Sequence, residues 1–322
     1  MTDRDAHRIS RLHERLARGE VVVMDGGSGT ELQAMGVPMD RAAWSALANL
    51  SHPETVRELH ARFLAAGAEI LITNTFAAGP GSLEAAGCGG RFEEANRNAI
   101  AAATAARAEA GRDDVVIAGS MSRMAAGGLS AAGETEAAFA AEGVLLDSYR
   151  RHAEVLAGAK VDALVLEMMG ARWHAVSAVT AAAETGLPVW LGLSVAEAGS
   201  GRAETIDGED VAELLRSLPL HAVDAIFVMH TDIRCVPGSL DAIRAVWDGV
   251  LGAYPHVGDW TSPVWVFHDI APAAFANAAS EWTARGAAIV GGCCGIGPSH
   301  IAALSDRYRT PPGTPSRWRA SR

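Results

Sequence analysis

The chain has 322 residues, of which 49% are hydrophobic and 20% are charged, a balance typical of a globular protein that buries one large core. Its 27 Lys and Arg against 38 Asp and Glu give a net charge of −11, which disfavours nucleic acid and membrane surfaces as partners and favours a small molecule. Four cysteines are too few for a secreted disulfide framework, and the N-terminal segment lacks the apolar stretch of an export signal, so we expect a cytoplasmic protein.

Eight short apolar runs, rich in Val, Ile and Leu, are typical of strands that are buried on both faces. In chain order they are Val21–Asp25, Ile70–Thr75, Val115–Ser120, Ala163–Glu167, Val189–Val195, Ala225–His230, Val264–Asp269 and Ala287–Gly292. Segments with helical periodicity separate them. The clearest is Ser51–Ala66, which we expect to begin with a capping box of Ser51 and Glu54 and to end at Gly67.

Eight strands that alternate with helices favour a single-domain (β/α)8 TIM barrel over an open, doubly wound sheet. We expect residues 1–20 to form an N-terminal helix, residues 21–309 to form the barrel, and residues 310–322 to be a disordered tail. Most of the predicted strands end on a polar side chain that could take part in catalysis or binding. In a barrel these strand ends converge on one mouth, where such enzymes keep their active sites.

The sequence around Cys293 and Cys294 is the strongest local signal for a metal. Both thiols follow the last predicted strand and are flanked by Gly291, Gly292 and Gly295, which allow the backbone to turn both side chains toward one ion. Zinc is the natural occupant of such a site. The alternative interpretation is a pair of buried cysteines that act as small hydrophobic residues.

Several motifs resemble those of the zinc-dependent homocysteine S-methyltransferases, in the family's order and spacing from about residue 20 to residue 308. They are Met24–Leu32, Trp44–Ala46, Leu71–Phe76, Gly291–Gly295 and Pro298–Ile301. The resemblance implies a (β/α)8 barrel in which three protein ligands hold zinc. It also implies that the thiol of homocysteine takes the fourth position and attacks a methyl group on the donor.

The third zinc ligand departs from the family pattern. The family has a cysteine after an asparagine at the end of strand six, whereas this chain has Met229 and His230 there. Imidazole is a good zinc ligand, so we expect a site of His230, Cys293 and Cys294, with Cys235 as the alternative to His230. The predicted seventh strand also departs from the family, because it ends on His268 and Asp269, which either orient a ligand or are ordinary polar groups at a strand end.

The resemblance also assigns residues to the substrates. Asp25 and Glu167 are expected to hold the ammonium group of homocysteine, and the backbone N–H groups of Gly26 and Gly27 its carboxylate. Asn74 and Thr75 are expected to be further polar groups of the site, or else to make structural hydrogen bonds at the strand end. Trp44 could hold a cationic methyl donor through cation–π attraction, or could be a core tryptophan.

The predicted activity is therefore methyl transfer to homocysteine, giving methionine. The expected donor is small and carries an onium group, such as S-methylmethionine, S-adenosylmethionine or a betaine. The partners would be this thiol and its donor, and a homo-oligomer is compatible with the sequence. The alternatives are the same chemistry on another small thiol or selenol, and an inactive barrel that binds a metal or an amino acid.

Overall fold

A computed structural model describes residues 3–123, 142–197, 203–261, 264–266 and 268–309. The predicted tail, residues 310–322, lies outside the described residues. No helix among the described residues is both long and apolar enough to cross a membrane.

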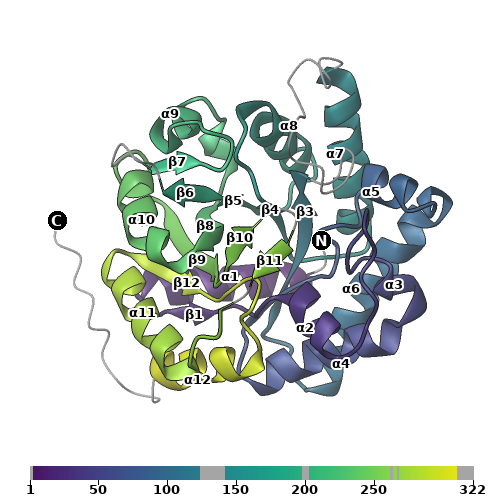
Figure 1. Cartoon of the computed structure of the whole chain (residues 1–322), viewed down its shortest axis with the longest axis horizontal. Coiled ribbons are helices and arrows are strands. Elements are labelled where there is room, and N and C mark those ends of the chain that lie inside the picture. The colour runs from purple at the N-terminus through teal and green to yellow at the C-terminus, as the bar shows by residue number, and fades with distance from the viewer. Residues whose placement is uncertain (1–2, 124–141, 198–202, 262–263, 267, 310–322) are drawn as a thin grey trace.

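Eight parallel strands form the barrel, and helices surround them (Figure 1). The strands lie in the order β1 (Val22–Val23), β12 (Ala287–Val290), β9 (Val250–His256), β8 (Ala225–Asp232), β5 (Val189–Leu193), β4 (Ala163–Glu167), β3 (Val116–Ser122) and β2 (Ile70–Ile72). A parallel bridge between Met24 and Ile70 joins the first strand of this order to the last. The predicted TIM barrel is therefore confirmed.

The helices follow the strands in the alternation that the sequence predicts. They are α1 (Asp3–Ala17), α2 (Ser28–Ala34), α3 (Ala48–Ser51), α4 (Pro53–Ala65), α5 (Pro80–Ala85), α6 (Phe92–Glu109), α7 (Glu142–Gly158), α8 (Arg172–Ala183), α9 (Val211–Arg216), α10 (Val236–Arg244), α11 (Pro272–Ala284) and α12 (Pro298–Tyr308), with 3-10 turns at Gly89–Arg91, Leu220–Ala222 and Ile233–Cys235. Two antiparallel hairpins, β6 (Val195–Glu197) with β7 (Ala203–Thr205) and β10 (Asp259–Thr261) with β11 (Val264–Val266), extend beyond the barrel strands.

Two predicted elements were wrong. Val264–Asp269 is not a barrel strand: its first residues form β11, and β9 takes the seventh place in the barrel. The capping box is also absent from α4, because Ser51 ends α3 and its hydroxyl donates to the carbonyl of Leu47. Gly67 does end the helical segment, with φ of +97°.

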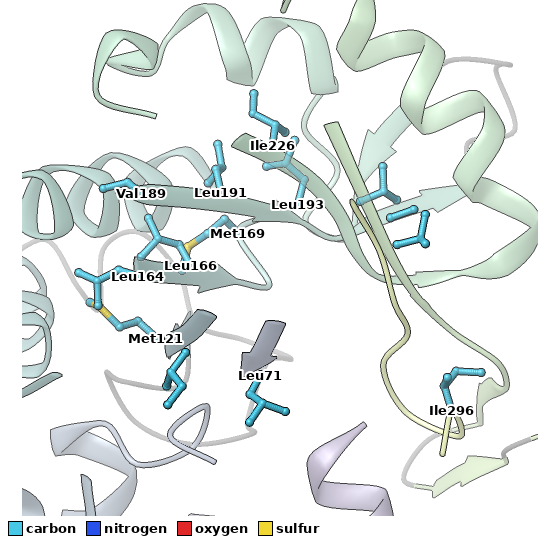
Figure 2. Close-up of a cluster of buried hydrophobic side chains, with 14 of the residues drawn as sticks. Leu71, Met121, Leu164, Leu166, Met169, Val189, Leu191, Leu193, Ile226 and Ile296 are labelled. Carbon is cyan, nitrogen blue, oxygen red and sulfur yellow. The ribbon is translucent and has the colours of Figure 1, made fainter. Parts of the chain in front are cut away.

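Apolar side chains fill the layer between the strands and the helices. Figure 2 shows part of this core, in which Leu164 and Leu166 of β4 lie near Leu191 of β5 and Met121 of β3. Since neighbouring residues of a strand face opposite sides, the alternate residues Val165 and Trp190 belong to a second cluster inside the barrel. This two-sided burial explains the continuous apolar runs in the sequence.

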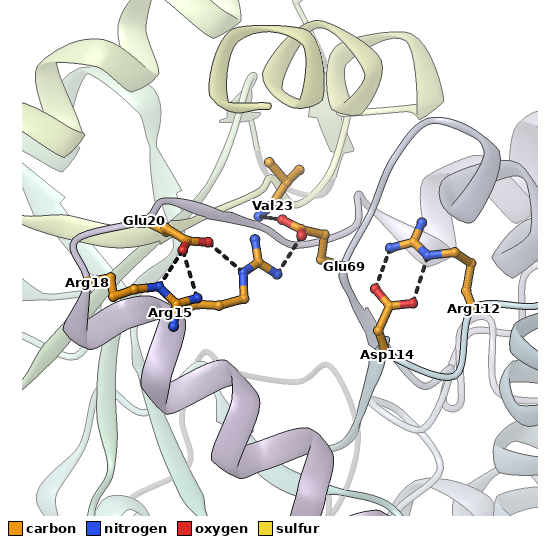
Figure 3. Close-up of polar contacts among 7 residues, drawn as sticks. All are labelled: Arg15, Arg18, Glu20, Val23, Glu69, Arg112 and Asp114. Atoms are coloured by element: carbon orange, nitrogen blue, oxygen red, sulfur yellow. Dashed lines mark hydrogen bonds and ion pairs between the residues drawn. The ribbon is translucent and has the colours of Figure 1, made fainter. Parts of the chain in front are cut away.

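Helix α1 closes the end of the barrel where the strands begin. Its Ile9 and Leu12 join the interior cluster, and its Arg8 donates to the buried Asp162 at 2.9 Å. Figure 3 shows a second anchor, in which Arg15 lies between Glu20 and Glu69. The opposite end, where the strands finish, is therefore the accessible mouth.

Candidate active site

A narrow cavity of about 40 Å³ lies at the mouth of the barrel. Its lining residues are Gly27, Ser28, Gly29, Trp44, Ser45, Ile72, Thr73, Asn74, Phe76, Glu167, His230, Tyr254, Cys293 and Cys294. A larger hollow of about 380 Å³ lies at the other end, beside α1. Its one charged lining residue is Asp224, whose carboxylate already accepts from the N–H of Val189. The chemical groups of the described residues therefore favour the mouth as the functional site.

Close backbone packing places the two cysteines at the mouth. A Cβ atom at Gly291 would lie 2.8 Å from the carbonyl oxygen of Asp25, and Gly295 has φ of +82°, so both positions favour glycine. The N–H of Cys293 donates to the carbonyl of Pro255 at 2.7 Å. The sulfur atoms of Cys293 and Cys294 then lie 3.6 Å apart, and both line the cavity, as predicted from the flanking glycines.

An irregularity in β8 brings His230 to the same cavity. Met229 packs inside the barrel, so a regular strand would direct the next side chain outward. The pairing of β8 with β9 shifts between Met229 and Asp232, and His230 has φ of +47°, a conformation uncommon for a residue other than glycine. His230 reaches Cys293 with Nδ1 at 3.0 Å from Sγ, and its Nε2 lies 2.8 Å from Oε2 of Glu167.

Cys235 lies apart from this group. It ends the 3-10 turn Ile233–Cys235, and its carbonyl accepts from the hydroxyl of Ser239 in α10. Among the described residues, the wall of the cavity includes His230 and not Cys235. The geometry therefore favours His230 as the partner of the two cysteines.

The donor set His230, Cys293 and Cys294 fits a thiophilic ion such as zinc. Tetrahedral zinc with Zn–S of about 2.3 Å and Zn–N of about 2.1 Å requires separations of about 3.8 Å between sulfurs and about 3.6 Å between sulfur and nitrogen. The sulfurs lie near that separation, at 3.6 Å, whereas the hydrogen bond between Cys293 and His230 is shorter, at 3.0 Å. No group of three His, Cys, Asp or Glu within the described ranges is already arranged as a metal site. Zinc binding would require Nδ1 of His230 and Sγ of Cys293 to move apart by about 0.6 Å.

Burial also makes the two thiols unequal. It raises the pKa of the Cys293 thiol well above its ordinary value, and the neighbouring sulfur of Cys294 and the Glu167 carboxylate act in the same direction. The pKa of Cys294 is lowered, chiefly by its hydrogen-bonded contact with the Cys293 side chain, 3.6 Å away. A cation is the partner that would stabilise both groups as thiolates.

An aromatic wall faces the cavity. The rings of Trp44 and Phe76 lie edge to face with centroids 6.2 Å apart, and the ring of Phe76 lies 5.1 Å from that of His230. Trp44 has φ of +43° and packs against Gly29, where a Cβ atom would lie only 2.6 Å from its ring. The predicted Trp44 therefore lines the cavity, and Phe76 is an additional aromatic member.

Asn74 and Thr75 make structural hydrogen bonds. The Asn74 amide donates to the carbonyl of Ser45 and to Oδ1 of Asn49, both at 2.9 Å, and accepts from the Ser45 hydroxyl at 2.7 Å. Thr75 donates to the carbonyl of Ser120 at 2.7 Å and joins β2 to β3. Asn74 thus fixes the loop that carries Trp44, in agreement with the structural alternative for these two residues.

Asp25 lies behind the cavity wall. It is fully buried, and its Oδ2 accepts from the N–H of Ile72 at 2.8 Å. Burial raises the pKa of its carboxyl group well above the ordinary value, and the charge of Glu167 adds to that effect. Tyr254, which lines the cavity, has its hydroxyl 3.4 Å from Oδ1 of Asp25 and donates to the carbonyl of Gly26 at 2.7 Å.

Gly26 and Gly27 have a packing role. Cβ atoms at these positions would lie 2.3 Å from the carbonyl of Ile296 and 2.5 Å from that of Cys293, respectively. The N–H of Gly27 donates to the carbonyl of Ile296 at 2.9 Å, so it would have to leave this partner to reach a substrate carboxylate, and the predicted contact stays a prediction. Both glycines allow the cysteine loop to approach β1.

His268 and Asp269 are exposed and follow β11, so their predicted position at the end of a barrel strand was wrong. Tyr254, from β9, is the residue that the seventh barrel strand contributes to the cavity. Sequence reasoning missed it because Gly252 and Pro255 interrupt the apolar run. The preceding pair Asp248 and Gly249, a typical turn signal, could have revealed the start of this strand.

Comparison with known proteins agrees with this architecture. A sequence profile described as "Homocysteine S-methyltransferase" matches residues 22–308. The chain belongs to the homocysteine S-methyltransferase family. Homocysteine S-methyltransferase 4 of Zea mays is 29% identical, with 90% of each chain covered. The homocysteine S-methyltransferase of Escherichia coli is 28% identical, with 92% of this chain and 98% of the relative covered.

Some relatives are named after the methyl donor. Betaine–homocysteine S-methyltransferase 1 of Xenopus tropicalis is 28% identical, with 94% of this chain and 78% of the relative covered. Among solved structures, the metallated form of the E. coli homocysteine methyltransferase MmuM superposes with a TM-score of 0.70 at 23% identity, over 92% of this chain and 99% of that one. The family membership makes this chain an S-methyltransferase by class, and the solved structure supports the barrel fold.

Proposed function

We propose that this protein is a zinc-dependent enzyme that transfers a methyl group from a small onium donor to the thiol of homocysteine, giving methionine. The observation that carries the proposal is the grouping of His230, Cys293 and Cys294 in the wall of a cavity that is also lined by the aromatic rings of Trp44 and Phe76. When bound by these three side chains, zinc would lower the pKa of a substrate thiol so that the thiolate is the nucleophile.

The chain's own residues would position both reactants. The negative charge of Glu167, on the cavity wall, suits the ammonium group of homocysteine. Burial raises the pKa of Asp25, which does not line the cavity, and so disfavours its charged form, which leaves Glu167 as the main anionic partner for this group. Trp44 and Phe76 suit a sulfonium or quaternary ammonium donor, because a cation over an aromatic face gains about 0.5–2 kcal/mol. S-methylmethionine, S-adenosylmethionine and betaines all meet this requirement.

The transfer is a single displacement. A bond forms between the substrate sulfur and the methyl carbon as the bond from that carbon to the onium atom breaks, and its electron pair leaves with the donor as a neutral sulfide or amine. Such a step needs in-line positioning within a narrow cavity more than it needs a protein acid or base. The low polarity of the aromatic wall also favours it, because charge is neutralised as the reaction proceeds.

Zinc content and methionine formation test the proposal together. The purified full-length protein should hold one zinc ion per chain and form methionine from homocysteine with at least one of the three donors. Stoichiometric zinc with no turnover on any donor would instead favour another thiol or selenol acceptor, or a barrel that only binds a metal. Since the thiols must stay reduced to bind zinc, we also propose a reducing compartment such as the cytoplasm.

A further inference from the structure

Hydrogen bonds occupy both carboxylate oxygens of Glu167, the last residue of β4. Its Oε2 lies 2.8 Å from Nε2 of His230, and its Oε1 accepts a short hydrogen bond from the hydroxyl of Ser120. The Glu167 side chain is only 4% exposed. The carboxylate is therefore held between β3 on one side and β8 on the other.

This contact determines which nitrogen of His230 faces the cysteines. A carboxylate only accepts hydrogen bonds, so Nε2 of His230 is the ring nitrogen that carries the proton and donates it. Nδ1 then presents its lone pair toward Sγ of Cys293, 3.0 Å away. In the other tautomer, Nε2 would have no proton to donate to the Glu167 carboxylate, and Nδ1 would have no free lone pair.

The direction of the His230 ring must be fixed for metal binding, which would not be required of a cysteine at this position. A thiolate can present any of its lone pairs to a metal, whereas an imidazole nitrogen has one lone pair in the ring plane. The backbone at His230 lies in an uncommon conformation at an irregular strand end, so the strand alone does not fix the ring direction.

We infer that Glu167 is a positioning residue, which fixes the tautomer and direction of His230 as a zinc ligand while Ser120 holds the carboxylate in place. The inference rests on the proposed zinc site. Carboxylates that accept from a metal-binding histidine raise its basicity and fix its ring, and their loss typically costs about 10- to 100-fold in metal affinity. Glu167 thus allows a histidine to stand where the resemblance to the family implies a cysteine.

A double-mutant cycle on the full-length zinc-loaded protein tests this role. Glu167→Gln is made in the native background and in a His230→Cys background, and zinc affinity is measured by competition with a chelator. Because Glu167 acts through His230, we expect Glu167→Gln to weaken zinc binding about 10-fold or more in the native background and less than about 2-fold in the His230→Cys background. Glu184→Gln, at an exposed ion pair with Arg150, is the matched control and should leave zinc affinity unchanged.

The Michaelis constant for homocysteine separates the two roles of a carboxylate. An equal loss of zinc affinity in both backgrounds, or no loss in the native one, would overturn the inference. A rise in this constant in both backgrounds with zinc affinity unchanged would show that Glu167 serves the ammonium group instead, and would also overturn it.

The zinc measurements also distinguish this inference from the proposed function. Absence of zinc from the native protein would overturn both. Bound zinc without methyl transfer would overturn the proposed function alone, since the cycle in zinc affinity still decides the role of Glu167. If His230→Cys does not fold, His230→Asn, which tolerates the positive φ, removes the ring that Glu167 holds; Glu167→Gln should then leave the weaker zinc affinity of that background unchanged, and a further 10-fold loss would overturn the inference.

Discussion

Gly29 controls the position of the aromatic wall, and Gly29→Ala is expected to impair use of the methyl donor. The added Cβ would lie 2.6 Å from Cη2 of Trp44, whereas carbon atoms in contact are normally about 3.5–4.0 Å apart. The ring must therefore move by about 1 Å. A misplacement of this size can cost about 100-fold in rate, so we expect kcat/KM for the donor to fall between about 10- and 100-fold.

Steady-state rates with varied donor and saturating thiol measure this effect. Zinc content should stay unchanged, because the three atoms nearest to the added Cβ all belong to the Trp44 ring and not to His230 or the cysteines. Gly158→Ala is the matched control: it lies at the exposed end of α7, and its added Cβ would have no atom within 4 Å. Donor kinetics of folded Gly29→Ala within twofold of that control would refute the assignment of Trp44 to the donor.

The remaining predictions concern the stability of the protein and the loop that carries Trp44. Burial lowers the pKa of His60 to about 4 from 6.5, so the unfolded state takes up a proton at higher pH than the folded state, and stability falls as the pH drops from about 6.5 to about 4. This difference corresponds to about 3 kcal/mol. Neither ring nitrogen of His60 has a partner within the described chain, so His60→Leu should raise Tm at pH 7 and flatten the pH dependence of Tm; an unchanged pH profile would refute this. Asp162→Ala should cost about 3–5 kcal/mol in urea unfolding, since it leaves Arg8 and Arg107 without their shared buried carboxylate, and a loss below 1 kcal/mol would contradict that view. Asn74→Ala should free the loop that carries Trp44, raising the Michaelis constant of the donor while zinc content, measured alongside, stays constant.

The barrel was predictable because most of its strands are continuous apolar runs, buried on both faces. The seventh strand was not, because local rules place Gly and Pro in turns. Gly252 of this strand packs closely, since a Cβ there would lie 2.2 Å from the ring of Phe227. The carbonyl of Pro255 accepts a hydrogen bond from the N–H of Cys293. Both reasons involve residues distant in the sequence.

The sequence predicted which residues belong to the candidate site better than it predicted their hydrogen bonds. Strand-end positions brought Cys293, Cys294 and His230 to one cavity, as expected. The partners of Asn74 and the contact between Glu167 and His230 depend on loops and strands that are far apart in sequence, so no local pattern could show them. Family resemblance pointed to Glu167 as a substrate residue, whereas the hydrogen bonds in this chain point first to the histidine.

X-ray absorption at the zinc K-edge tests the central proposal most directly, because it counts the atoms bound to the metal. The zinc-loaded protein should show two sulfur neighbours at about 2.3 Å and one imidazole nitrogen at about 2.0–2.1 Å, and addition of homocysteine should raise the number of sulfur neighbours to three. Bound zinc without sulfur neighbours, or a sulfur count that stays at two in the presence of homocysteine, would contradict the proposal that His230, Cys293 and Cys294 present a metal to the substrate thiol.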